Sequence, residues 1–201
     1  MTRRMNHLFA ATFSLLALTL GPVGLASAGT ATDVVKAKQT ALFDLLKKGG
    51  VENQKKVGAV FDEMLDYSAL AEASLGSEWA ARTDAEKQQF SELLKQLVRK
   101  AYERNLKKTL DFNVEYLSET PSGSAITVKT KAVSRKDARE EPVEIAFKLS
   151  EKGGVWRVQD IVTEGVSLVG SYRAQFTKII KKDGFPALIQ KMKDKLAKGD
   201  V

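Results

Sequence analysis

A change in the hydrophobic period near residue 112 limits the folds that are open to this chain. Before it, apolar residues recur every three or four positions, as on a helix with one buried face. After it, apolar and polar residues alternate, as on a half-buried strand, and the helical period returns from Leu168 to Lys198. This order is typical of an α+β fold in which helices from both chain ends cover one face of an antiparallel sheet.

Four helices are predicted before the strands and two after them. The expected ranges are about 32–48, 52–65, 66–76, 83–109, 168–182 and 185–198. The fourth helix begins with a capping box, because Thr83 and Glu86 stand three positions apart just before an apolar run. Its broad apolar stripe, from Phe90 to Tyr102, indicates a helix with one side in the core.

Four strands are predicted between these two groups of helices, joined by short connections into an antiparallel meander. They begin at Phe112, after the turn at 120–123, at Val143 and at Val155, and the charged residues 134–142 form a loop before the third strand. The inward-facing side chains are apolar and uncharged. A cavity left between the sheet and the helices would therefore be apolar.

The first 28 residues have the three regions of a secretory signal peptide. Two arginines precede the uncharged run 8–20, and the small residues 26–28 fit a cleavage site. Thirteen residues are too few to cross about 30 Å of hydrocarbon as a helix, which argues against a membrane anchor. The sequence therefore predicts a cleaved segment 1–28, one domain over 29–201 and a periplasmic location.

The residue types in the chain restrict its chemistry. There is no cysteine, and the one histidine lies within the expected signal peptide, so the remainder lacks a Ser-His-Asp or Cys-His catalytic set and a conventional zinc or copper site. We expect no catalytic residue, no metal and no cofactor. The chain is basic, with 32 Lys and Arg against 25 Asp and Glu, but lysines are interspersed with carboxylates. Anionic lipid surfaces and acidic partner rims fit this charge better than nucleic acid does.

The most specific motif runs from Trp156 to Phe176 and reads WRVQDIVTEGVSLVGSYRAQF. It resembles the signature of the toluene-tolerance family, the MlaC-like periplasmic phospholipid shuttles of the maintenance-of-lipid-asymmetry system, which act as auxiliary components of an ABC transporter. A second match lies upstream, in the segment 75–79 and the helix capped by Thr83. The resemblance covers nearly the whole chain after the expected signal peptide.

The resemblance implies a fold like that of nuclear transport factor 2 (NTF2), a cone of helices against a curved sheet with acyl chains inside. It implies that a phospholipid is carried between an outer-membrane lipoprotein complex and an inner-membrane substrate-binding ring with its ABC transporter, which maintains outer-membrane asymmetry. We expect a monomer without enzyme activity. Two alternatives stay open: an NTF2-like enzyme for a small apolar substrate, and a structural or chaperone-like periplasmic module with a filled core.

The expected lipid-binding residues are inward-facing side chains of the fourth helix, the strands and the fifth helix. They are Phe90, Leu94, Leu97, Val98, Tyr102, Ile126, Val128, Val143, Ile145, Phe147, Val158, Val166, Tyr172 and Phe176. For each of them the alternative is that it only fills the core. Tyr172 and Phe176 share a helix face, which places Arg173 towards the mouth and the head group. The alternative for Arg173 is a bridge to Asp160 or Glu164 that steadies the strand-to-helix junction.

Overall fold

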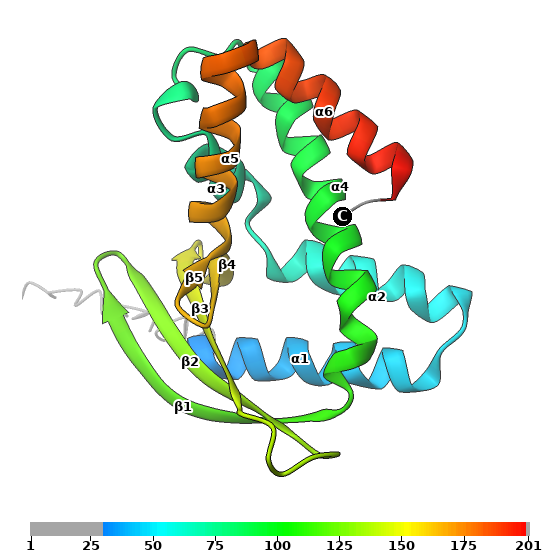
Figure 1. Cartoon of the computed structure of the whole chain (residues 1–201). Helices are drawn as coiled ribbons and strands as arrows, with labels where there is room; N and C mark the ends of the chain where they lie inside the picture. The colour runs from blue at the N-terminus through cyan, green and yellow to red at the C-terminus, as the bar shows by residue number, and fades with distance from the viewer. Residues whose placement is uncertain (1–29, 200–201) are drawn as a thin grey trace, which may run out of the picture.

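The computed structural model describes residues 30–199, apart from the side chains of 104–108, and the expected signal peptide lies outside these residues. Helices precede and follow one sheet (Figure 1), which confirms the α+β class. The helices are α1 (Ala31–Lys48), α2 (Val51–Met64), α3 (Tyr67–Leu75), the short 3₁₀ helix η1 (Gly76–Glu78), α4 (Asp84–Thr109), α5 (Leu168–Asp183) and α6 (Phe185–Lys198). The strands are β1 (Phe112–Ser122), β2 (Ala125–Ser134), β3 (Val143–Lys152), β4 (Val155–Thr163) and β5 (Val166–Ser167).

The sheet is antiparallel with the strand order β1-β2-β3-β4-β5. The four long strands are those that the alternating pattern predicts, except that β1 continues to Ser122, through residues expected in the turn at 120–123. The prediction of four strands is nevertheless wrong, because β5 pairs with the end of β4 as a fifth strand. Two residues are too few to show an alternating pattern in the sequence. Figure 1 shows β1 and β2 curving around α1, which packs against both.

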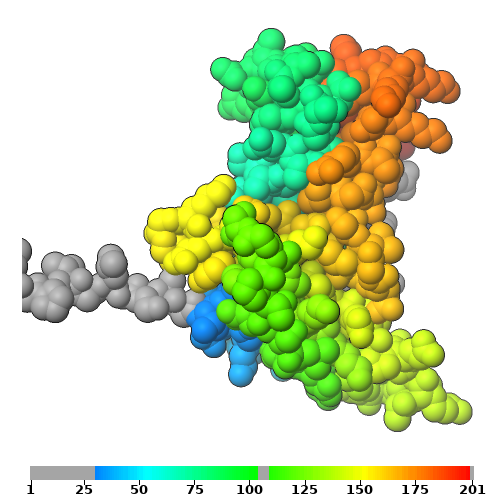
Figure 2. Space-filling model, turned by 90° about the vertical axis from the view of Figure 1, so that its left-hand side faces the viewer, coloured from blue at the N-terminus to red at the C-terminus, as the bar shows by residue number. Residues whose placement is uncertain are grey.

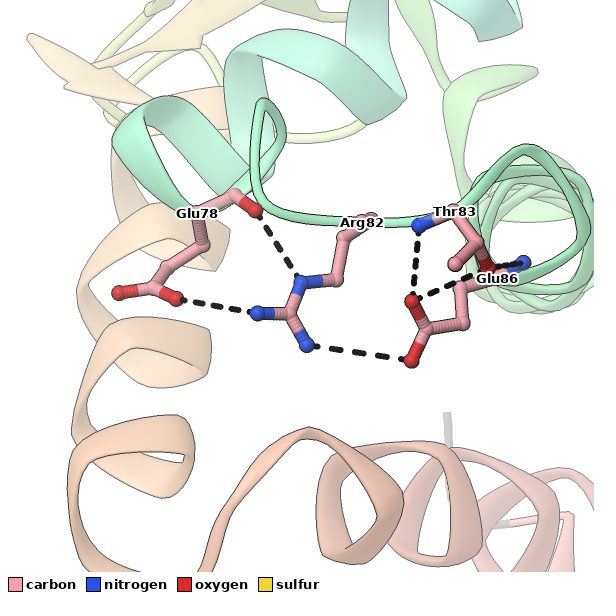
Figure 3. Close-up of polar contacts among 4 residues, drawn as sticks. All are labelled: Glu78, Arg82, Thr83 and Glu86. Atoms are coloured by element: carbon pink, nitrogen blue, oxygen red, sulfur yellow. Dashed lines mark hydrogen bonds and ion pairs between the residues drawn. The ribbon is translucent and has the colours of Figure 1, made fainter.

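The capping box predicted at the start of α4 is present (Figure 3). The Thr83 backbone N–H donates to Glu86 Oε2 (2.9 Å), and the Glu86 N–H donates to Thr83 Oγ1 (3.3 Å). Arg82 lies between Glu78 and Glu86, with nitrogen–oxygen distances of 4.0 and 3.9 Å. Its guanidinium also lies 4.8 Å from the centre of the Phe185 ring. The start of α4 is therefore fixed to η1 and to the first turn of α6.

The two halves of α4 have different neighbours. Near its start, the Phe90 ring lies edge-on to that of Phe176 in α5, with 5.4 Å between centroids, and 6.4 Å from that of Phe185 in α6. Further along, the Tyr102 ring lies 5.5 Å from that of Phe61 in α2. The helices α3 and α5 lie side by side at the same end as the start of α4 (Figure 1 and Figure 2). Only the second half of the α4 stripe therefore approaches the sheet.

No helix within residues 30–199 is both long enough and apolar enough to cross a membrane. The helices instead bury one face each and leave the other to solvent, as α6 does with Leu188, Met192 and Leu196 inside and its lysines outside.

Candidate functional site

An apolar pocket of about 330 Å³ lies between the sheet and helices α1, α2 and α4. Its buried lining residues include Leu42 of α1, Phe61 and Met64 of α2, and Phe147 and Ile161 of the sheet. A volume of this size is at the lower end of the range of small-molecule pockets, about 300–1,000 Å³. The pocket is therefore large enough to hold part of an apolar ligand.

The space is left open by small side chains on the inner face of the sheet. Val114, Ala132 and Val143 are neighbours across β1, β2 and β3, and all three line the pocket. Strand alternation points them to the same side as Ile145 and Phe147. Because the middle position of this row is an alanine, its short side chain leaves space between the sheet and the helices opposite.

The lining is electrically neutral. None of the described side chains that line the pocket belongs to Asp, Glu, Lys, Arg or His. Burial raises the pKa of Tyr102, with smaller contributions from Tyr172 and Asp160, so its hydroxyl stays protonated. Within residues 30–199, no group of three His, Cys, Asp or Glu side chains is placed to hold a metal ion. The arrangement suits burial of an uncharged apolar chain.

A polar contact holds α1 to β1 at one wall of the pocket. The Tyr116 hydroxyl donates to Gln39 Oε1, and the Gln39 side chain lines the pocket. Burial raises the pKa of Tyr116, so this hydroxyl remains a neutral donor. Lys36, one helical turn away from Gln39, lies 6.0 Å from the centre of the Tyr116 ring. A molecule in the pocket would therefore meet the side-chain amide of Gln39 at this wall, and the Lys36 ammonium group would lie outside the pocket.

Four of the fourteen residues predicted to bind lipid line this pocket, namely Tyr102, Val143, Ile145 and Phe147. A separate slot of about 100 Å³ between α4, α5 and α6 is lined by three others: Leu97, Tyr172 and Phe176. The remaining residues are in the core or on the surface. Phe90, Leu94, Val98, Val128 and Val158 are buried, Ile126 is half-buried against the core, and Val166 is exposed.

Two of these placements correct the expectations from the sequence. The first half of the α4 stripe does not face the sheet, because α5 and α6 cover it, and so Phe90 packs against Phe176 and Phe185. Val166 does not point inward either. It is 62% exposed, because it lies in the edge strand β5.

The α1 and α2 contributions to the pocket were not identified from the sequence. Gln39, Leu42 and Phe43 come from α1, and Phe61 and Met64 come from α2. The apolar stripes of both helices were detectable. Helical periodicity identifies the buried face of a helix but not the element that packs against that face. The apolar periodicity of α1 and α2 therefore could not show that these residues line the pocket.

Arg173 contacts neither of its expected acidic partners. Its Nε donates to the Ala73 carbonyl in the last turn of α3 (2.7 Å). Asp160 instead accepts hydrogen bonds from Ser167 Oγ (2.7 Å) and the Val169 N–H (3.1 Å), which begin α5. Arg173 thus joins α5 to the C-terminal end of α3, where orphan carbonyls need donors.

Arg173→Ala is expected to lower the free energy of unfolding by about 1 kcal/mol, because the Ala73 carbonyl loses its charged donor. Ligand content of the folded protein should not change, since Arg173 does not line the pocket. Urea unfolding measures the first quantity and mass spectrometry of extracts the second. Lys178→Ala, at an exposed position of the same helix, is the matched control. Unchanged stability with loss of ligand would instead assign Arg173 to the head group.

Comparison with known proteins agrees with the motif at 156–176. The model of the MlaC protein family matches residues 32–194, which confirms the resemblance. The fold is similar to that of a phospholipid-binding protein from Ralstonia solanacearum, solved in complex with a phospholipid, with a TM-score of 0.73. The two chains are 20% identical, and the alignment covers 86% of this chain and 100% of the other, so the likeness establishes the fold. No curated protein matches the chain by sequence.

Proposed function

The chain belongs to the MlaC protein family, and from this premise we propose that it carries a phospholipid with its acyl part in the pocket between the sheet and α1, α2 and α4. The observation that carries the proposal is the neutral, apolar lining of this pocket. Its fold, shared with a phospholipid-binding protein, adds support. An enzyme acting on an apolar substrate would need an acid or base in the lining, and the described lining residues offer none.

The energetics suit a carrier. Each methylene group removed from water contributes about 0.8 kcal/mol, so a chain of about sixteen carbons gains on the order of 12 kcal/mol. A bilayer offers nearly the same environment, and exchange between protein and membrane is therefore close to balanced. The loaded protein would keep its lipid in water and release it only to an apolar acceptor.

The pocket volume bears on how the lipid is held. About 330 Å³ is at the lower end of the range for small-molecule pockets, although a diacyl phospholipid is a large ligand. We therefore propose that the interior enlarges on loading or that part of the acyl chains stays outside it. The head group would remain at the mouth, where the half-exposed Thr109 and the exposed Thr163 lie on the rim.

The route of transport belongs to the same proposal. The expected signal peptide would place the protein in the periplasm, as a monomer that moves lipid between an outer-membrane lipoprotein complex and an inner-membrane substrate-binding ring with its ABC transporter. Family membership and the residue pattern of 1–28 support this route. The carrier would use no energy source of its own, so direction would come from its partners.

The proposal is tested by extracting the purified protein with organic solvent and analysing the extract by mass spectrometry. We expect one glycerophospholipid per chain, also visible as added mass on the intact protein under native conditions. A protein that has been delipidated should take up phospholipid again from vesicles. A chain that stays free of lipid in both experiments would refute the proposal and favour the structural module.

A further inference from the structure

The excess positive charge of the described residues lies in the last two helices. Residues 168–199 contain eight Lys and Arg and two Asp, which gives a net charge of +6. Residues 30–167 contain 22 basic and 22 acidic residues and are therefore neutral overall. The net positive charge of residues 30–199 therefore comes from the segment that forms α5 and α6.

Five of the seven lysines of these helices form two exposed stripes. Residues three, four and seven positions apart share one face of a helix. The stripes consist of Lys178 and Lys182 on α5 and of Lys191, Lys195 and Lys198 on α6. Within residues 30–199, the one carboxylate paired with a stripe lysine is that of Asp183, 2.6 Å from Lys191 Nζ. The other four stripe lysines are available to an external anion.

The apolar slot of about 100 Å³ lies between the two helices that carry the stripes. Phe176 of α5 and Leu188 and Met192 of α6 contribute to its lining, and Lys191 and Lys195 belong to it as well. It shares no lining residue with the pocket of the proposed function. Figure 1 shows α5 and α6 meeting beside the start of α4, whereas α1 and the β1–β2 hairpin lie at the other end.

We propose that this basic surface, made of the two lysine stripes and the slot between them, docks on an anionic phospholipid bilayer. Clusters of four to eight basic residues are attracted to anionic membranes, and lysine is a mobile point charge suited to a fluid layer of phosphates. Protein interfaces favour arginine and aromatic residues and contain little lysine. The stripes contain no arginine, so a bilayer fits them better than an acidic protein does.

Docking would hold the carrier at a membrane through residues that take no part in the pocket. The slot would receive the apolar part of one surface lipid, and the lysines would lie at the level of its phosphates. This inference does not require the pocket to hold phospholipid, because the pocket and the basic surface are made of different residues. Extracted lipid content tests the pocket, and vesicle binding tests the basic surface.

The test is flotation of the purified chain with vesicles of phosphatidylcholine alone or with about a quarter phosphatidylglycerol. We expect binding to the anionic vesicles at low salt and its loss at about 0.3 M salt, where charges are screened within a few ångströms. The triple variant Lys178→Gln, Lys182→Gln, Lys195→Gln should bind at least about tenfold more weakly. The matched control Lys55→Gln, Lys56→Gln, Lys129→Gln removes the same charge from α2 and β2, where all three lysines are exposed, and should bind normally.

Thermal unfolding and extracted lipid content are measured on both triple variants, and neither should change. The proposal is overturned if the unaltered chain does not float with anionic vesicles, or if it floats equally with neutral ones. It is overturned as well if the control loses binding to the same degree as the stripe variant. If the stripes bind an acidic protein and the chain binds no vesicles, the basic surface is a site for a protein partner and the membrane proposal is wrong.

Discussion

Ala132→Phe is expected to reduce bound phospholipid roughly tenfold or more while the chain remains folded. Ala132 is the small central member of the inner row Val114–Ala132–Val143, and its side chain lines the pocket. A phenyl ring added there would occupy part of the pocket of about 330 Å³, at its centre, where acyl carbons would otherwise lie. Since the ring enters existing space, the cost of overpacking should stay below the usual 1–3 kcal/mol or so.

The matched control for this variant is Ala146→Phe. Ala146 lies on the neighbouring strand β3 and pairs with Lys129, on the outer face of the sheet, away from the pocket. Both variants add the same ring to the same sheet, so lipid content per folded chain separates filling of the pocket from a general effect on folding. Equal lipid content in Ala132→Phe and the unaltered chain would show that the acyl chains lie elsewhere.

The fold was largely predictable because its elements follow local rules. Alternation identified β1 to β4, and the Thr83–Glu86 pair located the start of α4. These features depend on residues a few positions apart. The strand β5 escaped the prediction because two residues cannot show a period.

The pocket was less predictable because it depends on which elements face each other. The inward direction of Val143, Ile145 and Phe147 follows from strand alternation. The contribution of Phe61 depends on how α2 crosses the sheet, about 80 residues away in sequence from β3. The Arg173–Ala73 contact joins residues 100 positions apart. No local sequence pattern relates two such distant residues, so this contact could not be predicted.

Phe90→Ala is expected to lower the free energy of unfolding by about 3–5 kcal/mol, the usual cost of removing a buried phenyl ring. Phe90 is completely buried, and its ring contacts Phe176 and Phe185, which come from the two C-terminal helices. Loss of the ring would leave a cavity where α4, α5 and α6 meet. Gln89→Ala, at the exposed neighbouring position, should change the stability by less than about 0.5 kcal/mol.

The same variant decides whether Phe90 belongs to the core or to the lipid site. Its side chain does not line the pocket, so the folded fraction of Phe90→Ala should contain as much phospholipid as the unaltered chain. Urea unfolding gives the stability, and mass spectrometry of the purified folded fraction gives the lipid content. If Phe90→Ala does not fold, Phe90→Leu keeps most of the apolar volume and allows the same comparison. Normal stability combined with loss of lipid would place Phe90 in the acyl-chain site, because only a ligand contact could then account for the change.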